Sequence, residues 1–133
     1  MALRRTKQPD YRGELQAEVM AAVWRLGEAS VEGTRGELRG PREPAYTTVQ
    51  TVMNRLVERG LLGRERRGHA YVYRARVNEA DFLRRTIGER LAGASPAARR
   101  TALLNLLGDL EPEELHEVAR YTRRIQRARA EER

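Results

Sequence analysis

Hydrophobic residues recur at helical spacing in two stretches near the start of the chain. In residues 14–26 they fall on one face of a helix, and Gly27 follows as a residue type that commonly ends helices. The apolar positions of this face are Leu15, Val19, Ala22, Val23 and Leu26. Ser30 is placed to cap a second, shorter helix that reaches about Arg39. Its inward positions are Val31, Thr34 and Leu38.

Residues 44–60, PAYTTVQTVMNRLVERG, predict a third helix whose two faces differ in chemistry. The apolar face carries Val49, Val52, Met53, Leu56 and Val57. The opposite face carries Thr47, Thr48, Gln50, Thr51, Asn54 and Arg55. A solvated helix face usually presents Glu and Lys, whereas hydroxyl and amide groups can hydrogen-bond to base edges in the major groove of DNA. An ordinary amphipathic helix with unusual surface residues is the alternative explanation.

A β-hairpin is predicted directly after this helix. Residues 61–66 and 70–76 read as two short strands around Arg67-Gly68-His69, with Tyr71 and Tyr73 alternating with Val72. A hairpin in this position is a wing, and its flanks carry Arg64, Arg66, Arg67, His69, Arg74 and Arg76, opposed only by Glu65. Charge can simply protect the edge of a hairpin. Here the arginines also lie where a wing meets the phosphates that flank a binding site.

Three further helices are expected in residues 78–133. Asn78 caps the first, which runs to about Ala92; Ser95 and Pro96 start the second, and Pro112 starts the third, whose last residues we expect to fray. Their apolar residues are Phe82, Leu83, Ile87, Leu91, Leu103, Leu104, Leu106, Leu107, Leu115, Val118 and Ile125. Three short helices bury too little apolar surface to fold alone. We therefore expect these faces to pair with a second copy of the chain in a two-fold dimer.

The composition of the chain limits the kinds of partner that it can have. At 133 residues it fits one domain, or one small domain plus an appendage. The absence of cysteine excludes disulfides and thiolate metal sites and suits the reducing cytoplasm. No run of 18 apolar residues and no signal-peptide core occur, so no membrane insertion is expected. The net charge is +7, and residues 1–77 carry 15 basic against 9 acidic residues. A polyanionic partner of this first part is therefore favoured.

These patterns together predict a mainly α protein with a winged helix-turn-helix, built from three helices and a two-stranded wing, and a C-terminal three-helix dimerisation region. Residues 1–12 are expected to form a flexible basic arm, residues 13–77 the DNA-binding domain and residues 78–133 the dimerisation region. Base edges are assigned to Gln50, Thr51, Thr47 and Asn54. Phosphates are assigned to Arg55, Arg64, Arg66 and Arg67, with Thr48 at either and His69 beside them.

Other functional classes fit the sequence less well than sequence-specific DNA binding does. A non-specific architectural DNA-binding protein would share the basic wing without needing the amide and hydroxyl face. An enzyme is disfavoured because no phosphate loop or nucleophile motif occurs, and no cofactor is expected. A metal site from Glu113, His116 and Glu117 is conceivable, but such spacing is common on solvated helices. A protein adaptor would be expected to expose large apolar or acidic residues on the third helix, and none are there.

Three blocks of sequence resemble the penicillinase repressor family of bacterial regulators. They are AEVMAAVW (17–24), AYTTVQTVMNRLVERGLL (45–62) and HAYVYRARV (69–77), and with the three-helix tail the resemblance covers about residues 13–127. It implies a homodimeric repressor that binds palindromic operators in double-stranded DNA upstream of antibiotic-resistance genes. In that family the third helix enters the major groove and the wing touches the backbone. The position of Gln50 is often basic in other members, which implies a different operator sequence here.

The resemblance also bears on induction. Some family members are induced when a membrane sensor-protease system triggers cleavage of an Asn-Phe bond in the fifth helix. The matching bond here is Asn105-Leu106, and the leucine departs from that pattern. A copper-responsive branch senses metal through C-terminal cysteines, which this chain lacks.

Overall fold

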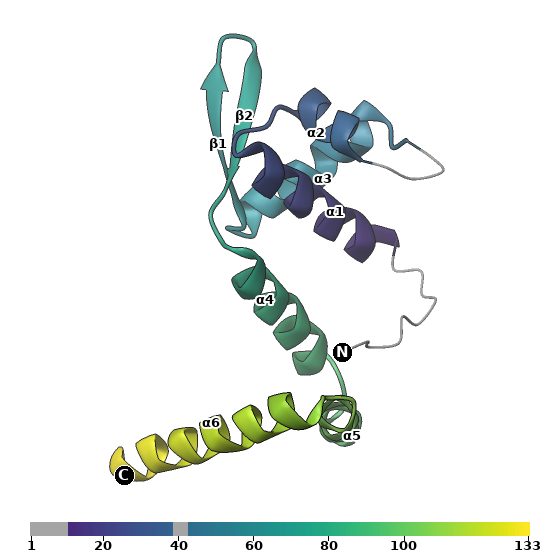
Figure 1. Cartoon of the computed structure of the whole chain (residues 1–133). Helices are drawn as coiled ribbons and strands as arrows, with labels where there is room; N and C mark the ends of the chain where they lie inside the picture. Colours follow the sequence, from purple (N-terminus) through teal and green to yellow (C-terminus); the bar gives the residue numbers. More distant parts are fainter. Residues whose placement is uncertain (1–10, 39–42) are drawn as a thin grey trace. The chain divides into compact units, whose positions relative to one another are not determined.

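The computed structural model describes residues 11–38 and 43–133, with side chains from residue 14 onward. The chain divides into two compact units, one ending at Gly88 and one comprising the C-terminal residues from Glu89. The elements in order are α1 (Tyr11–Leu26), α2 (Val31–Glu37), α3 (Tyr46–Glu58), β1 (Leu62–Arg67), β2 (Ala70–Ala75), α4 (Glu79–Ala92), α5 (Pro96–Gly108) and α6 (Pro112–Glu131) (Figure 1). The predicted mainly α winged helix-turn-helix, with three helices after it, is confirmed.

The core of the first unit lies between α1, α2, α3 and the hairpin. Its buried apolar residues are Leu15, Val19, Met20, Ala22, Val23, Ala29, Val31, Leu38, Val49, Met53, Leu56, Leu61, Leu62, Tyr73 and Phe82. The inward face predicted for α1 is confirmed except at Leu26, which is 41% exposed. Leu26 is the last residue of α1, and Gly27 at a φ of 78° turns the chain toward α2, so the side chain extends past the core.

Local hydrogen bonds explain where α2 and α3 begin and end. The Ser30 hydroxyl accepts from the Gly33 amide at 2.9 Å, and the buried Thr34 hydroxyl donates to the Ser30 carbonyl at 2.8 Å. At the end of α3, Gly60 has a φ of 75°, and the Leu61 amide donates to the Leu56 carbonyl at 2.9 Å. This is the Schellman arrangement, which needs a residue without Cβ. The cap predicted at Ser30 and the stop predicted at Gly60 are confirmed.

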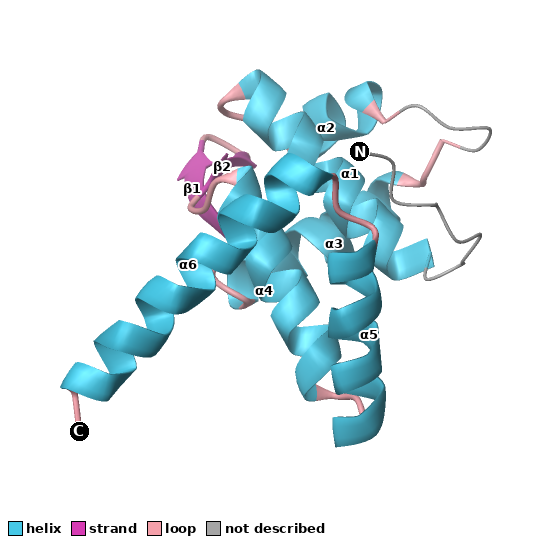
Figure 2. Ribbon diagram, turned by 60° about the horizontal axis from the view of Figure 1, so that its bottom comes forward, coloured by secondary structure: helices cyan, strands magenta, loops and turns pink. Residues whose placement is uncertain are grey.

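The two strands form an antiparallel hairpin in which Leu62 pairs with Ala75 and Arg67 with Ala70. Gly68, at a φ of 62°, opens the two-residue turn, as in type II′ hairpins. β1 starts one residue later than predicted, because the Leu61 amide ends α3. Ala29 pairs with β2 through an isolated β-bridge: its amide donates to the Tyr73 carbonyl at 3.0 Å and its carbonyl accepts from the Tyr73 amide at 2.8 Å. Figure 2 shows this small sheet beside the helices.

The first turns of α4 belong to the core of the first unit. Asn78 caps the helix by accepting from the Asp81 amide at 2.8 Å. Phe82 is 7% exposed and meets the edge of Trp24, with ring centroids 5.9 Å apart. The Trp24 indole also donates to the Val77 carbonyl at 2.9 Å. The prediction that Phe82 contributes to a dimer interface is wrong, because Trp24 and the core of its own chain already cover its ring.

Two long helices, α5 and α6, follow in the second unit. Ser95 caps α5 by accepting from the Ala98 amide at 3.2 Å, and Glu111 with Glu114 forms a capping box at the start of α6. α6 continues to Glu131, so the predicted fraying is wrong; Arg, Ala and Glu are all strong helix formers. None of the side chains of α5 or α6 is buried.

Parts of two predictions lie outside the described residues. Of the arm expected at residues 1–12, positions 1–10 are outside them, while Tyr11 and Arg12 already belong to α1. Arg39, the expected end of the second helix, also lies outside them, and the segment before α3 is described from Glu43 onward. Within the described ranges, no helix is long and apolar enough to cross a lipid bilayer.

Candidate nucleic-acid interface

The face of α3 that is turned away from the core carries the predicted base-contacting residues. Thr47, Thr48, Thr51 and Arg55 are exposed, and Gln50 is half-buried. The Thr51 hydroxyl donates to the Thr47 carbonyl at 2.9 Å, which leaves its methyl group and its lone pairs toward solvent. Val49, Met53 and Leu56 on the opposite side are fully buried. The packing of the core therefore fixes which side of α3 faces outward, while contacts of this side with bases remain a prediction.

Asn54 lies on the same outward side but is already engaged within the protein. Its Oδ1 atom accepts from the Tyr73 hydroxyl and from Nη1 of Arg64, both at 2.8 Å. The sequence pattern gave no sign of this bridge, because the three residues lie on three different elements. Only the amide nitrogen of Asn54 is left without a partner among the described residues.

One face of the hairpin carries Arg64 and Arg66. Arg64 pairs with Tyr73 in the strand register and Arg66 with Tyr71, so these four side chains share a face. The Arg64 guanidinium carbon lies 4.4 Å from the centroid of the Tyr71 ring, a cation–π contact. Arg66 is exposed, and within the described part of the chain it forms no ion pair. The two cations of this face therefore differ in how they are held, because Arg64 contacts α3 and the Tyr71 ring, whereas Arg66 donates to the Gly68 carbonyl at 3.4 Å.

On the other face of the hairpin, carboxylates of the same chain neutralise most of the arginine charge. Glu28, between α1 and α2, accepts two hydrogen bonds from Arg67, at 2.8 and 3.1 Å, and also pairs with Arg74. Arg67 additionally lies 3.6 Å from a Glu65 oxygen. The expectation that only Glu65 opposes the wing arginines is wrong, because Glu28 is remote in sequence and folding brings it to the hairpin. Arg67 therefore differs from Arg64 and Arg66 in holding a carboxylate already.

Tyr73 anchors this region to the core. Its side chain is 1% exposed. Burial raises the pKa of its hydroxyl above the ordinary value of 10.0, and nearby Arg64 offsets only part of that effect. Tyr73 is therefore a neutral hydrogen-bond donor at any physiological pH. His69, in the turn of the hairpin, is exposed.

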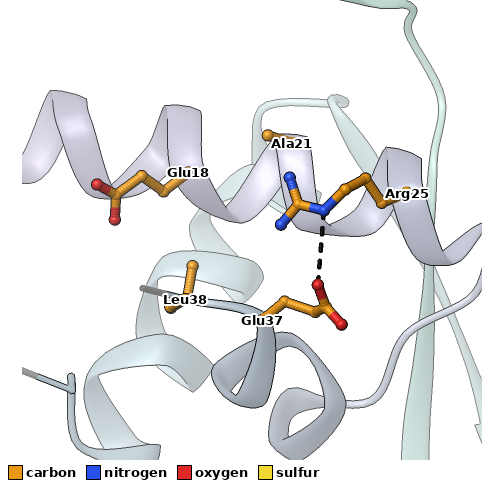
Figure 3. A pocket seen from close by; sticks show the side chains of 5 residues that line it. All are labelled: Glu18, Ala21, Arg25, Glu37 and Leu38. Atoms are coloured by element: carbon orange, nitrogen blue, oxygen red, sulfur yellow. Dashed lines mark ion pairs between the residues drawn. The ribbon is translucent and has the colours of Figure 1, made fainter. Parts of the chain in front are cut away.

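A surface hollow of about 440 Å³ lies between α1 and α2, away from these residues (Figure 3). It is lined by Glu18, Ala21, Arg25, Glu37 and Leu38. Arg25 and Glu37 form an ion pair across it at 3.5 Å, and Figure 3 shows the Glu18 carboxylate pointing away from that pair. No predicted site residue lines this hollow.

Most of the residues predicted for dimerisation are exposed, on α4, α5 and α6. Leu91 is half-buried, and the others on α4, α5 and α6 are between 36% and 55% exposed. These others are Leu83, Ile87, Leu103, Leu104, Leu106, Leu107, Leu115, Val118 and Ile125. Asn105 and Leu106 are both exposed within α5. In the described ranges, no three His, Asp or Glu side chains converge as a metal site requires.

Comparison with known proteins identifies the family. The model of the penicillinase repressor family matches residues 12–124. An uncharacterized 16.5 kDa protein in the ptsI 3' region of Latilactobacillus sakei is 30% identical over 91 residues, which cover 66% of this chain and 62% of that protein. The penicillinase repressor of Bacillus licheniformis is 26% identical over 70 residues, which cover 53% of this chain and 55% of that protein.

The chain thus spans between half and two thirds of the length of these relatives. Among solved structures, the DNA-binding domain of the repressor BlaI is 24% identical with a TM-score of 0.46, over 59% of this chain and 93% of that one. The family model itself extends from the start of α1 into α6. The chain therefore belongs to the penicillinase repressor family, as its sequence blocks predicted.

Proposed function

We propose that this protein is a homodimeric transcriptional repressor that acts in the cytoplasm on palindromic operators in double-stranded DNA. In this proposal α3 enters the major groove and the wing lies on the phosphate backbone. The observation that carries it is the outward face of α3, where Thr47, Thr48, Gln50 and Thr51 present hydroxyls, methyls and an amide instead of Glu and Lys. Membership in a family of repressors supports it, and the family name points to antibiotic-resistance genes as the targets.

Contacts are divided by chemistry. Gln50, Thr47 and Thr51 read base edges, because amides and hydroxyls match the donors and acceptors of the major groove. Arg55, Arg64 and Arg66 bind phosphates, and Thr48 is placed for either kind of contact. Arg67 and His69 complete the phosphate-facing part of the wing.

The exposed leucines of the second unit support the dimer. A two-fold pair presents two copies of α3, which multiplies the specificity of a single short contact. A membrane sensor-protease is a further partner in this proposal. Because the Asn105-Leu106 bond lies inside α5, proteolysis there requires local unwinding of the helix first.

The test is selection of DNA sites from a random library with the full chain, followed by Gln50→Ala. We expect a two-fold symmetric consensus, and a loss of roughly 1–3 kcal/mol on that site with little change on scrambled DNA. An equal loss on both DNAs would contradict the assignment of Gln50 to a base. Enrichment without any consensus would instead indicate an architectural DNA-binding protein.

A further inference from the structure

The side chain of Asn54 joins α3 to the hairpin through two hydrogen bonds. Its Oδ1 atom accepts from the Tyr73 hydroxyl and from Nη1 of Arg64. An amide oxygen has two lone pairs, and both are used here. Because a guanidinium can only donate, the contact with Arg64 also fixes which amide atom faces the hairpin. The oxygen of Asn54 is therefore not available to a base.

The two donors are held to very different degrees. Tyr73 is fully buried, and its main chain exchanges two hydrogen bonds with Ala29. Arg64 is exposed, but its guanidinium is held between the Asn54 oxygen and the Tyr71 ring. Tyr71 in turn meets Tyr73 edge-on, with ring centroids 6.5 Å apart. A surface cation is thus linked by two routes to a core side chain.

We propose that Asn54 is a positioning residue that holds the Arg64 guanidinium at a fixed place relative to the outward face of α3. A DNA phosphate bound by Arg64 and the bases that contact α3 then belong to one fixed register along the duplex. This inference rests on the proposed function and changes the role of Asn54 from base contact to support of Arg64. An arginine that is already held loses less rotamer freedom on binding, so the arrangement raises affinity by preorganisation.

Two double-mutant cycles test this role. The DNA is the duplex enriched from a random library by the wild-type chain, with a scrambled duplex beside it. Asn54→Ala is combined with Arg64→Ala in one cycle and with Arg66→Ala in the other. Arg66 is the matched control, because it lies on the same hairpin face and has no contact with Asn54.

We expect Asn54→Ala to weaken binding of the enriched duplex about tenfold in the wild-type background and less than about twofold when Arg64 is already alanine. With Arg66→Ala the two losses should simply add. Repeating the selection with Asn54→Ala should return the same consensus. An undiminished effect in the Arg64→Ala background, or a relaxed preference at one base pair, would overturn the proposal, because Asn54 would then contact DNA itself.

A measurement without DNA tests whether Asn54 holds Arg64 independently of the DNA-binding function. Relaxation of the arginine side-chain Nε–Hε groups in NMR spectra should show Arg64 more ordered than Arg66 in the wild type, and Arg64 less ordered in Asn54→Ala than in the wild type, because only the Tyr71 ring still holds it. Equal mobility of both arginines in the wild type would overturn the positioning role whatever the DNA result. Failure of the wild type to enrich any DNA, with Arg64 ordered, would overturn the DNA-binding function while leaving the structural link established. A thermal melt of each variant verifies that the fold is intact.

Discussion

At the scale of single residues, the buried Tyr73 ring is linked to the surface by the hydrogen bond that its hydroxyl donates to Asn54. Removing this hydroxyl tests the link. Tyr73→Phe removes the donor to Asn54 and should lower the free energy of unfolding by about 1 kcal/mol at neutral pH. Chemical denaturation at fixed protein concentration, followed through the fluorescence of Trp24, measures this. Tyr46→Phe is the matched control, because it removes a hydroxyl from a ring that is 46% exposed and should cost little.

The difference in stability between wild type and Tyr73→Phe should depend on pH. Burial raises the pKa of Tyr73 above 10.0, so the folded state favours the protonated hydroxyl. Its contribution to stability is therefore complete below pH 10 and is lost as the pH rises through the higher pKa of the folded state. The advantage of wild type over Tyr73→Phe should shrink above about pH 10. An advantage that stays constant between pH 7 and the alkaline range would contradict a buried, protonated hydroxyl.

Residue roles were predictable from the sequence where they depend on one element alone. Helical spacing placed Thr47, Thr51 and Arg55 on the outward side of α3, and the structure exposes all three. The bridge from Asn54 to Tyr73 could not be predicted, because the two residues are 19 positions apart and meet only when the hairpin folds back on α3. The pairing of Glu28 with Arg67, at a separation of 39, has the same origin.

At the scale of elements, the wing has one face with exposed cations and one face that Glu28 neutralises. Glu28→Gln should free Arg67 and Arg74 for phosphates and therefore strengthen binding to DNA of any sequence. The salt slope of log K should steepen by about 1 for each freed arginine that neutralises a phosphate. Fluorescence anisotropy titrations over a range of salt concentrations measure both effects. The exposed ion pairs themselves contribute at most about 1 kcal/mol to stability, so the fold should survive.

Glu32→Gln is the control for this change in charge. Glu32 pairs with Arg35 on α2 at 3.2 Å, so its substitution changes the net charge equally without freeing a wing arginine. Weaker DNA binding by Glu28→Gln than by Glu32→Gln would show that Glu28 serves to hold the wing in place. The sequence located the hairpin through its alternation and Gly68, but only the β-bridge between Ala29 and Tyr73 explains why Glu28 reaches it.

At the scale of the whole molecule, α5 and α6 leave apolar side chains such as Leu104 and Leu115 exposed. The sequence predicted the three helices after the wing correctly, because Asn78, Ser95, Pro96 and Pro112 are local start signals. It also predicted a shared interface, yet it assigned Phe82 there. Apolar spacing alone cannot distinguish a residue that packs on its own core from one that awaits a partner. The structure makes that distinction, since Phe82 is 7% exposed and Leu115 is 44% exposed.

The interface can be tested on α6 with one substitution and its neighbour. Leu115→Glu places a charge on the apolar side, whereas His116→Glu places the same charge about 100° further round the helix. If a partner chain covers Leu115, the first change loses about 1.5–3 kcal/mol of apolar burial and also buries a charge. The dissociation constant of the dimer should therefore rise at least about a hundredfold. Sedimentation should show monomers at micromolar concentration for Leu115→Glu and dimers for wild type and His116→Glu.

Because Leu115 lies outside the first unit, the fluorescence of Trp24 should be unchanged and a half-site duplex should still bind weakly. A wild type that sediments as a monomer would refute the dimer, and a Leu115→Glu variant that stays dimeric would place the interface on another face.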